Sequence, residues 1–127
     1  MKVILKEIAH SKQRYPTVGD WQWKKNGDLV INVSKMKAND RRYFLLVAFH
    51  EFIEAVLCDE RGIFDSDVTA FDVAYEARRH EGDESEPGND VLAPYYKEHQ
   101  FATELEHELA DELNVDWEEY EKTINEL

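Results

Sequence analysis

His50, Glu51 and Glu54 form an H-E-x-x-E motif inside an apolar run at residues 43–57. The run is apolar almost all the way round a helix, and a helix of that kind belongs in a protein core. Ionisable groups there destabilise the fold unless something pairs with them. The motif differs by one residue from H-E-x-x-H, which presents two zinc ligands and a general base on consecutive turns. These three residues are therefore predicted to form a functional site.

Helix geometry suggests a role for each member of the motif. Positions 50 and 54 lie one turn apart, and position 51 lies about 100° round from position 50. A divalent metal, zinc by preference, held by His50 and Glu54 would have Glu51 beside it, placed to take a proton from a metal-bound water. A buried hydrogen-bond network without a metal is the alternative.

A metal site needs a third ligand, and His99 is the candidate. It lies on the edge of the apolar stripe of a helix expected over residues 94–113. Two histidines and one glutamate are the ligand set of common catalytic zinc sites. Glu106 lies two turns beyond His99, about 10 Å by helix rise, so it is expected to support a ligand or to belong to a second site. The alternative for His99 is a boundary histidine with an ordinary hydrogen bond.

Two further pairs of residues are candidates for supporting roles. Asp72 and Glu76 are one turn apart on a helix expected over residues 67–80. They could accept hydrogen bonds from the N–H groups of ligand imidazoles, and a solvated acidic face explains them equally well. Tyr95 or Tyr96 could donate a hydrogen bond to the oxyanion that forms during hydrolysis.

The elements that must position these residues are a small sheet and several helices. Residues 2–8 are predicted to form a strand, and Asn26-Gly27 predicts a hairpin between strands at 21–25 and 28–34. The dipeptide suits a type I′ turn, in which both central residues have positive φ. Helices are expected over about 40–60, 67–80 and 94–113, with a short fourth helix capped by Asp116. The predicted fold class is α+β, with a small N-terminal antiparallel sheet of strand plus hairpin packed on three to four helices.

Length and composition limit the classes of function. The chain has 127 residues and a net charge of −13, so a single domain is expected and direct nucleic-acid binding is not. Cys58 is the only cysteine, which excludes an intrachain disulfide and a cysteine-rich zinc module. No segment approaches the ~20 apolar residues of a membrane span. The expectation is a cytoplasmic protein with no membrane partner, of undetermined oligomeric state.

The order strand, hairpin and then LLVAFHEFIEAVL resembles the minimal core of the zincin-like metallopeptidases. The resemblance implies that His50 is the first metal ligand, that Glu51 is the general base and that Glu54 replaces the second histidine. It also implies a sheet edge above the motif helix that holds a peptide substrate as an added strand.

A second resemblance covers most of the chain from the motif helix onward. The strings HEFIEA (50–55), EPGND (86–90), APYYKEH (93–99) and DWEEY (116–120) resemble those of a group of small phage and prophage proteins. This resemblance implies no particular activity, and a bacterial host cell as the location. It also implies that loop 86–90, Tyr95 and His99 belong to the same site as the motif helix.

Three functions are compatible with these residues. The leading hypothesis is a zincin-like metal-dependent hydrolase that acts on a peptide or protein. The second is a non-enzymatic acidic phage interaction protein on a degenerate zincin-like fold, which binds a basic partner through loop carboxylates such as Asp83 and Glu84. The third is a magnesium-dependent nucleotide pyrophosphohydrolase, since the acidic pairs at 51 and 54 and at 108 and 111 resemble its paired motifs.

Overall fold

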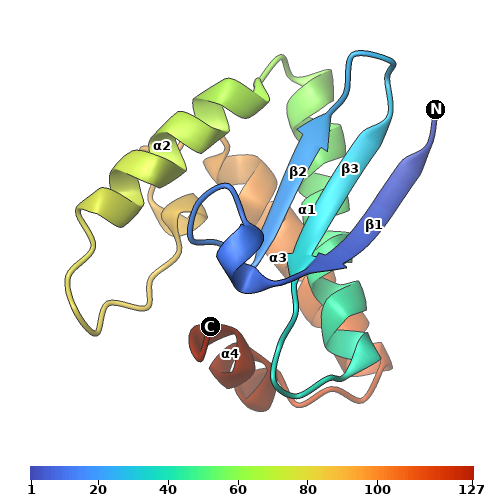
Figure 1. Ribbon diagram of the computed structural model, residues 1–127, viewed down its shortest axis with the longest axis vertical. Coiled ribbons are helices and arrows are strands. Elements are labelled where there is room, and N and C mark those ends of the chain that lie inside the picture. Colours follow the sequence, from blue (N-terminus) through green and yellow to red (C-terminus); the bar gives the residue numbers. More distant parts are fainter.

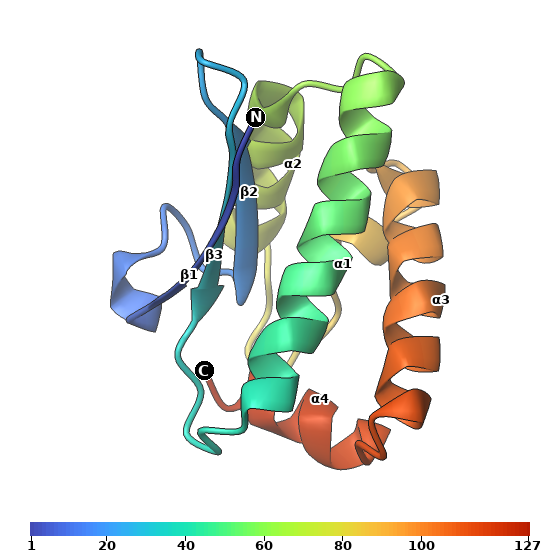
Figure 2. The same cartoon turned by 90° about the vertical axis from the view of Figure 1, so that its right-hand side faces the viewer.

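Helix α1 (Arg41–Glu60) is the middle layer of an α+β fold in the computed structural model of residues 1–127. A three-stranded sheet covers one side of α1, and helix α3 (Tyr96–Glu112) covers the opposite side (Figure 2). This arrangement explains why the sequence of α1 is apolar nearly all round, because two of its faces are buried at once. Leu46, Val47, Ala55 and Cys58 are among its fully or nearly fully buried residues. The predicted α+β class is confirmed.

The sheet contains β1 (Val3–Ile8), β2 (Gly19–Trp23) and β3 (Leu29–Ser34) in the order β1-β3-β2 (Figure 1). Strand β2 pairs antiparallel with β3 as the hairpin prediction required, but β1 pairs parallel with β3. The prediction of an antiparallel sheet was therefore wrong for β1. The physical reason is the connection from β1 to β2, which carries the chain past β3 and leaves the two strands on opposite sides of it. The alternating residues Leu29, Ile31 and Val33 of β3 are all completely buried.

The hairpin turn differs from the predicted type I′ turn. Gly27 has a φ of +89°, but Asn26 does not have a positive φ. The Gly27 N–H donates to the Lys24 carbonyl over 2.9 Å, and the Lys24 N–H donates to the Asp28 carbonyl over 2.8 Å. This pattern is the longer hairpin loop in which a tight turn is followed by one left-handed glycine. The side chain of Asn26 accepts from the Asp28 N–H and stabilises this alternative.

The remaining helices lie around the α1–α3 pair. They are α2 (Asp65–Ala77), α4 (Trp117–Asn125) and the short 3₁₀ helices η1 (His10–Lys12) and η2 (Pro87–Asn89). Asp116 caps α4 through a side-chain hydrogen bond, as predicted, and Asp40 caps α1 in the same way. Helix α2 starts two residues before the predicted position 67, and Asp65 in its first turn accepts from Thr69 and Arg14.

The most buried face of α3 is not the row of large apolar residues that repeats every four positions, Phe101, Leu105, Leu109 and Leu113. Phe101 is 46% exposed, whereas His99, Ala102, Glu106 and Ala110 are buried. Two alanines on this face let α3 approach α1 closely, and the two ionisable side chains beside them enter the interior. No helix has the combination of length and apolar character needed to cross a bilayer.

Candidate metal centre

Three side chains from α1 and α3 converge in the interior. His50 Nε2 lies 3.1 Å from Glu54 Oε2 and 3.2 Å from His99 Nδ1, and His99 Nδ1 lies 3.0 Å from the same Glu54 oxygen. All three residues are buried. The predicted trio of His50, Glu54 and His99 is therefore brought together, although His99 is 49 residues from His50 in the chain.

The spacing of these three atoms fits a metal ion. The three atoms lie 3.0 to 3.2 Å from one another, so all of them could contact one ion at the normal zinc–ligand distance of ~2.1 Å. His50, Glu54 and His99 would then supply three protein ligands, the number that catalytic zinc sites have. Two nitrogens and one carboxylate oxygen are ligands that zinc accepts readily.

Each histidine uses its outer ring nitrogen to bind a second carboxylate. His50 Nδ1 lies 2.8 Å from Glu106 Oε1, and His99 Nε2 lies 2.9 Å from Glu86 Oε2. A carboxylate on the outer nitrogen holds a proton there, so the inner nitrogen of a neutral imidazole carries a lone pair. Both inner nitrogens then direct their lone pairs to the point that Glu54 also faces. Three lone pairs without a hydrogen atom among them repel one another unless a cation or protons lie between them.

Two further residues hold this arrangement in place. The hydroxyl of Tyr120, which is completely buried, donates to Glu106 Oε2 over 2.6 Å. Trp21 Nε1 donates to Glu54 Oε1 over 3.0 Å, which leaves Oε2 to face the histidines. Glu54 and Glu106 thus each use one carboxylate oxygen to accept from a supporting residue and the other to contact a histidine of the centre. Such supporting hydrogen bonds are typical of metal sites.

Without an ion, protons take its place. Burial by itself would raise the pKa of Glu54, but the hydrogen bonds with His50 and His99 outweigh it and lower that pKa to about 2. Burial would lower the pKa of His99, but Glu54 and Glu86 raise it to about 9. The pKa of His50 is also raised, because Glu106 and Glu54 outweigh its burial. A metal ion would therefore compete with protons for this site.

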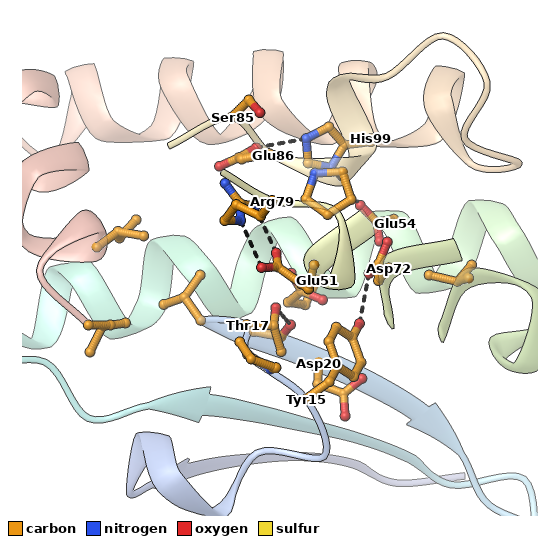
Figure 3. A pocket seen from close by; sticks show the side chains of 18 of the residues that line it. Tyr15, Thr17, Asp20, Glu51, Glu54, Asp72, Arg79, Ser85, Glu86 and His99 are labelled. Atoms are coloured by element: carbon orange, nitrogen blue, oxygen red, sulfur yellow. Dashed lines mark hydrogen bonds and ion pairs between the residues drawn. The ribbon is translucent and has the colours of Figure 1, made fainter. Parts of the chain in front are cut away.

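Glu51 lies at the wall of a cavity of about 330 Å³ next to the centre. Burial, with the charge of Glu54 nearby, raises its pKa well above the ordinary range. Its carboxylate has no hydrogen-bond partner in the protein, and it shares the cavity wall with Glu54 and His99. The cavity is bounded by β2, α2 and the segment that precedes α3. Figure 3 shows Glu86 and His99 on one side of it and Tyr15 and Asp20 on the other, with Glu51 and Asp72 between.

Gly19 and Gly88 have no side chain, and the space where a Cβ atom would lie is taken by Glu51 and His99. A Cβ atom added to Gly19 would lie 2.7 Å from Glu51 Cγ, and one added to Gly88 would lie 2.4 Å from the His99 ring. Neither glycine has a positive φ, so space rather than backbone conformation requires glycine at both positions. Gly88 belongs to η2, so the loop that carries Glu86 also packs directly on His99.

The predicted supporting residues have mixed outcomes. Glu106 lies behind His50, as expected. Asp72 does not bind a ligand imidazole, because its two oxygens accept from the hydroxyls of Tyr95 and Tyr15. Burial raises the pKa of Asp72 to about 6 against the opposing effect of these hydrogen bonds. Glu76 forms an ion pair with Arg79 at 2.7 Å.

Trp21 and Tyr120 of the centre were not predicted from the sequence, whereas the loop that contains Glu86 and Gly88 was. For Trp21, the only sequence feature that could have indicated a role in the centre is its inward-facing position in the hairpin. For Tyr120, it is its position in the DWEEY string. Glu86 belongs to the EPGND string that the phage resemblance assigned to the site. Gly88 lies in the same string, but its contact with His99 depends on the packing of η2. The acidic pair Glu108 and Asp111 is exposed and lies away from the centre, so it does not form a joint site with Glu51 and Glu54.

Comparisons of the chain with protein-family models, with curated proteins and with solved structures found no match. The resemblances to zincin-like metallopeptidases and to phage proteins therefore stay predictions.

Proposed function

We propose that the protein is a metal-dependent hydrolase whose divalent cation, zinc by preference, is held by His50, Glu54 and His99. The main support for this proposal is that the lone pairs of His50 Nε2, His99 Nδ1 and Glu54 Oε2 converge on one point. Both outer imidazole nitrogens are already bound to carboxylates, which supports a metal over a closed hydrogen-bond network. A nitrogen-rich ligand set disfavours magnesium, which prefers oxygen ligands.

The surrounding residues fit hydrolysis. A divalent cation at this position supplies a Lewis acid, which polarises a carbonyl group and lowers the pKa of a coordinated water. Glu51 is the base in this proposal, because its carboxylate is free of hydrogen bonds and burial raises its pKa, which makes it a better proton acceptor. Tyr95 is not assigned the oxyanion, since its hydroxyl donates to Asp72.

A peptide is the substrate class that the sheet supports best. Strand β2 has β3 on one side only, and residues 19–21 of β2 line the cavity beside the centre. An edge strand can add an extended peptide through backbone hydrogen bonds, and a peptide here would displace the Thr17 hydroxyl that donates to the Gly19 carbonyl. A peptide bound there would pass Glu51 and Glu54.

Metal analysis of protein purified without a histidine tag tests the proposal. Wild-type protein is expected to hold close to one equivalent of zinc, and His50→Ala is expected to lose it. Glu51→Gln is expected to keep the metal and lose hydrolysis of casein or a mixed peptide library. Zinc far below one equivalent, with no uptake from added zinc and no difference between wild type and His50→Ala, would exclude the site.

A further inference from the structure

The cavity beside the metal centre is strongly acidic. Arg79 is the only arginine or lysine among its lining residues, whereas aspartates and glutamates line it on every side. The positive charge of Arg79 is already used by Glu76 through two hydrogen bonds. The carboxylate of Asp20 is likewise matched by Arg14, at 2.7 and 2.8 Å.

Three carboxylates of the lining have no cationic partner after these pairs are removed, and the exposed one, Glu84, accepts from the side-chain amide of Asn125. Glu51 has no hydrogen bond, and Asp72 accepts only from the neutral hydroxyls of Tyr15 and Tyr95. A divalent ion does not neutralise them, because Glu54 and Glu86 already offset its charge. An anionic substrate such as a phosphate ester would therefore be repelled from this cavity even when the metal is bound.

Tyr15 lines the same cavity wall as Glu51 and Asp72. Its hydroxyl donates to Asp72 over 2.8 Å, and burial, together with the charges of Asp72 and Glu51, raises its pKa. Figure 3 shows Tyr15, Asp72 and Glu51 facing the same space. A phenol ring with carboxylates beside it is a good environment for an ammonium or guanidinium group.

We propose that the substrate is a basic peptide, and that a lysine or arginine side chain next to the scissile bond lies in the space bounded by Tyr15, Glu51 and Asp72. Cleavage of such a peptide rests on the proposed function. The preference for a basic over an acidic peptide depends only on the charges of the residues that line the cavity.

Binding of two fluorescein-labelled peptides to zinc-loaded protein tests the inference. The peptides share one alanine-rich sequence with either lysine or glutamate at the variable positions, and anisotropy is measured at 0.15 M salt, where exposed charges are largely screened. Asp72→Asn is expected to weaken binding of the lysine peptide about tenfold without loss of zinc. Asp67→Asn is the matched control, because Asp67 is exposed on the same helix and outside the cavity.

Glu51→Gln is the second variant, and it guards against a folding defect of Asp72→Asn. Its carboxylate supports no hydrogen bond, so the fold is expected to survive while lysine-peptide binding weakens. Equal binding of the lysine peptide by Asp67→Asn and by both cavity variants would overturn the inference. Mass spectrometry of the same samples separates the two proposals. Charge-dependent binding without cleavage would contradict the hydrolase, and cleavage without charge dependence would contradict the basic substrate.

Discussion

Glu54 occupies the position where an H-E-x-x-H motif has its second histidine. Its two oxygens have different roles, since Oε1 accepts from Trp21 and Oε2 faces His50 and His99. A free carboxylate on a helix rotates among several rotamers, whereas this one is held from both sides. The second nitrogen ligand is supplied by α3 instead. The departure from the common motif is thus a redistribution of ligands between two helices.

The contact between Gly88 and His99 predicts a selective loss of metal. In Gly88→Ala the new Cβ would overlap the His99 ring, so the ring must move away from His50 and Glu54. Displacement of one ligand is expected to reduce zinc affinity by at least about tenfold. Competition with a chromogenic chelator measures this affinity.

Gly19→Ala is the matched control, because its Cβ meets Glu51 and Val47 and no proposed ligand. It is expected to keep zinc affinity near that of wild type and to disturb the base. Equal zinc affinities in the two alanine variants would contradict the assignment of His99.

The raised pKa of His99 predicts a pH-dependent stability of the metal-free protein. The groups around its ring are Glu54, Glu86, His50 and Tyr95. Because the folded-state pKa of about 9 exceeds the unfolded value of 6.5, the stabilisation is complete below pH 6.5 and is lost as pH rises through 9. Urea unfolding in chelator is expected to show a fall of roughly 3 kcal/mol over this interval. A profile that is flat from pH 6.5 to 9 would contradict the ionised pairs.

Among the elements, α4 has a role beyond covering the core. It carries Tyr120, whose hydroxyl holds Glu106, which in turn holds His50. Tyr120→Phe leaves a buried carboxylate oxygen without its donor, which costs ~1–3 kcal/mol of unfolding free energy. It is also expected to weaken zinc binding by about tenfold or more, because supporting residues of this kind affect metal affinity.

Tyr43→Phe provides the comparison for that variant. The two tyrosine rings are 5.2 Å apart, but the Tyr43 hydroxyl makes no hydrogen bond to Glu106. It is expected to match wild type in zinc affinity and in denaturant midpoint. If both phenylalanine variants bind zinc alike, the chain of contacts from α4 to His50 has no influence on the metal.

The structural features that depend on the spacing of residues close together in the chain were predicted from the sequence. The motif helix and the closeness of His50 to Glu54 follow from helix periodicity, and the structure has both. His99 was predicted because it lies on the inner edge of an amphipathic helix. The hairpin was also predicted, although its turn has only one residue of positive φ.

Features that depend on which segments meet in space were not predictable. The parallel pairing of β1 requires the strand order, and a single sequence does not contain it. The buried face of α3 is set by close packing of Ala102 and Ala110 on α1, which outweighs the larger apolar surface of its leucines. The positions of Trp21 and Glu86 depend in the same way on contacts across the fold.

At the scale of the whole molecule, a bound metal is expected to stabilise the fold. An ion that binds only the folded state adds about 2.7 kcal/mol of unfolding free energy at a free concentration one hundred times its Kd. Zinc is therefore expected to raise the thermal midpoint, while magnesium at the same concentration is not, because the centre is rich in nitrogen ligands. His50→Ala should abolish the response in differential scanning fluorimetry. An equal response to both ions in wild type and variant would indicate non-specific binding to the acidic surface.

The two helices that supply the proposed ligands lie on either side of an exposed acidic stretch at residues 81–86. An ion shared by His50 and His99 would be a reversible crosslink that closes a loop of 49 residues. By the chain-entropy relation for disulfides, a closed loop of that size corresponds to about 4 kcal/mol. A protease cut within residues 81–86 would then leave two pieces held together by the ion as well as by the packing of α3 on α1, so removal of the ion is expected to weaken their association.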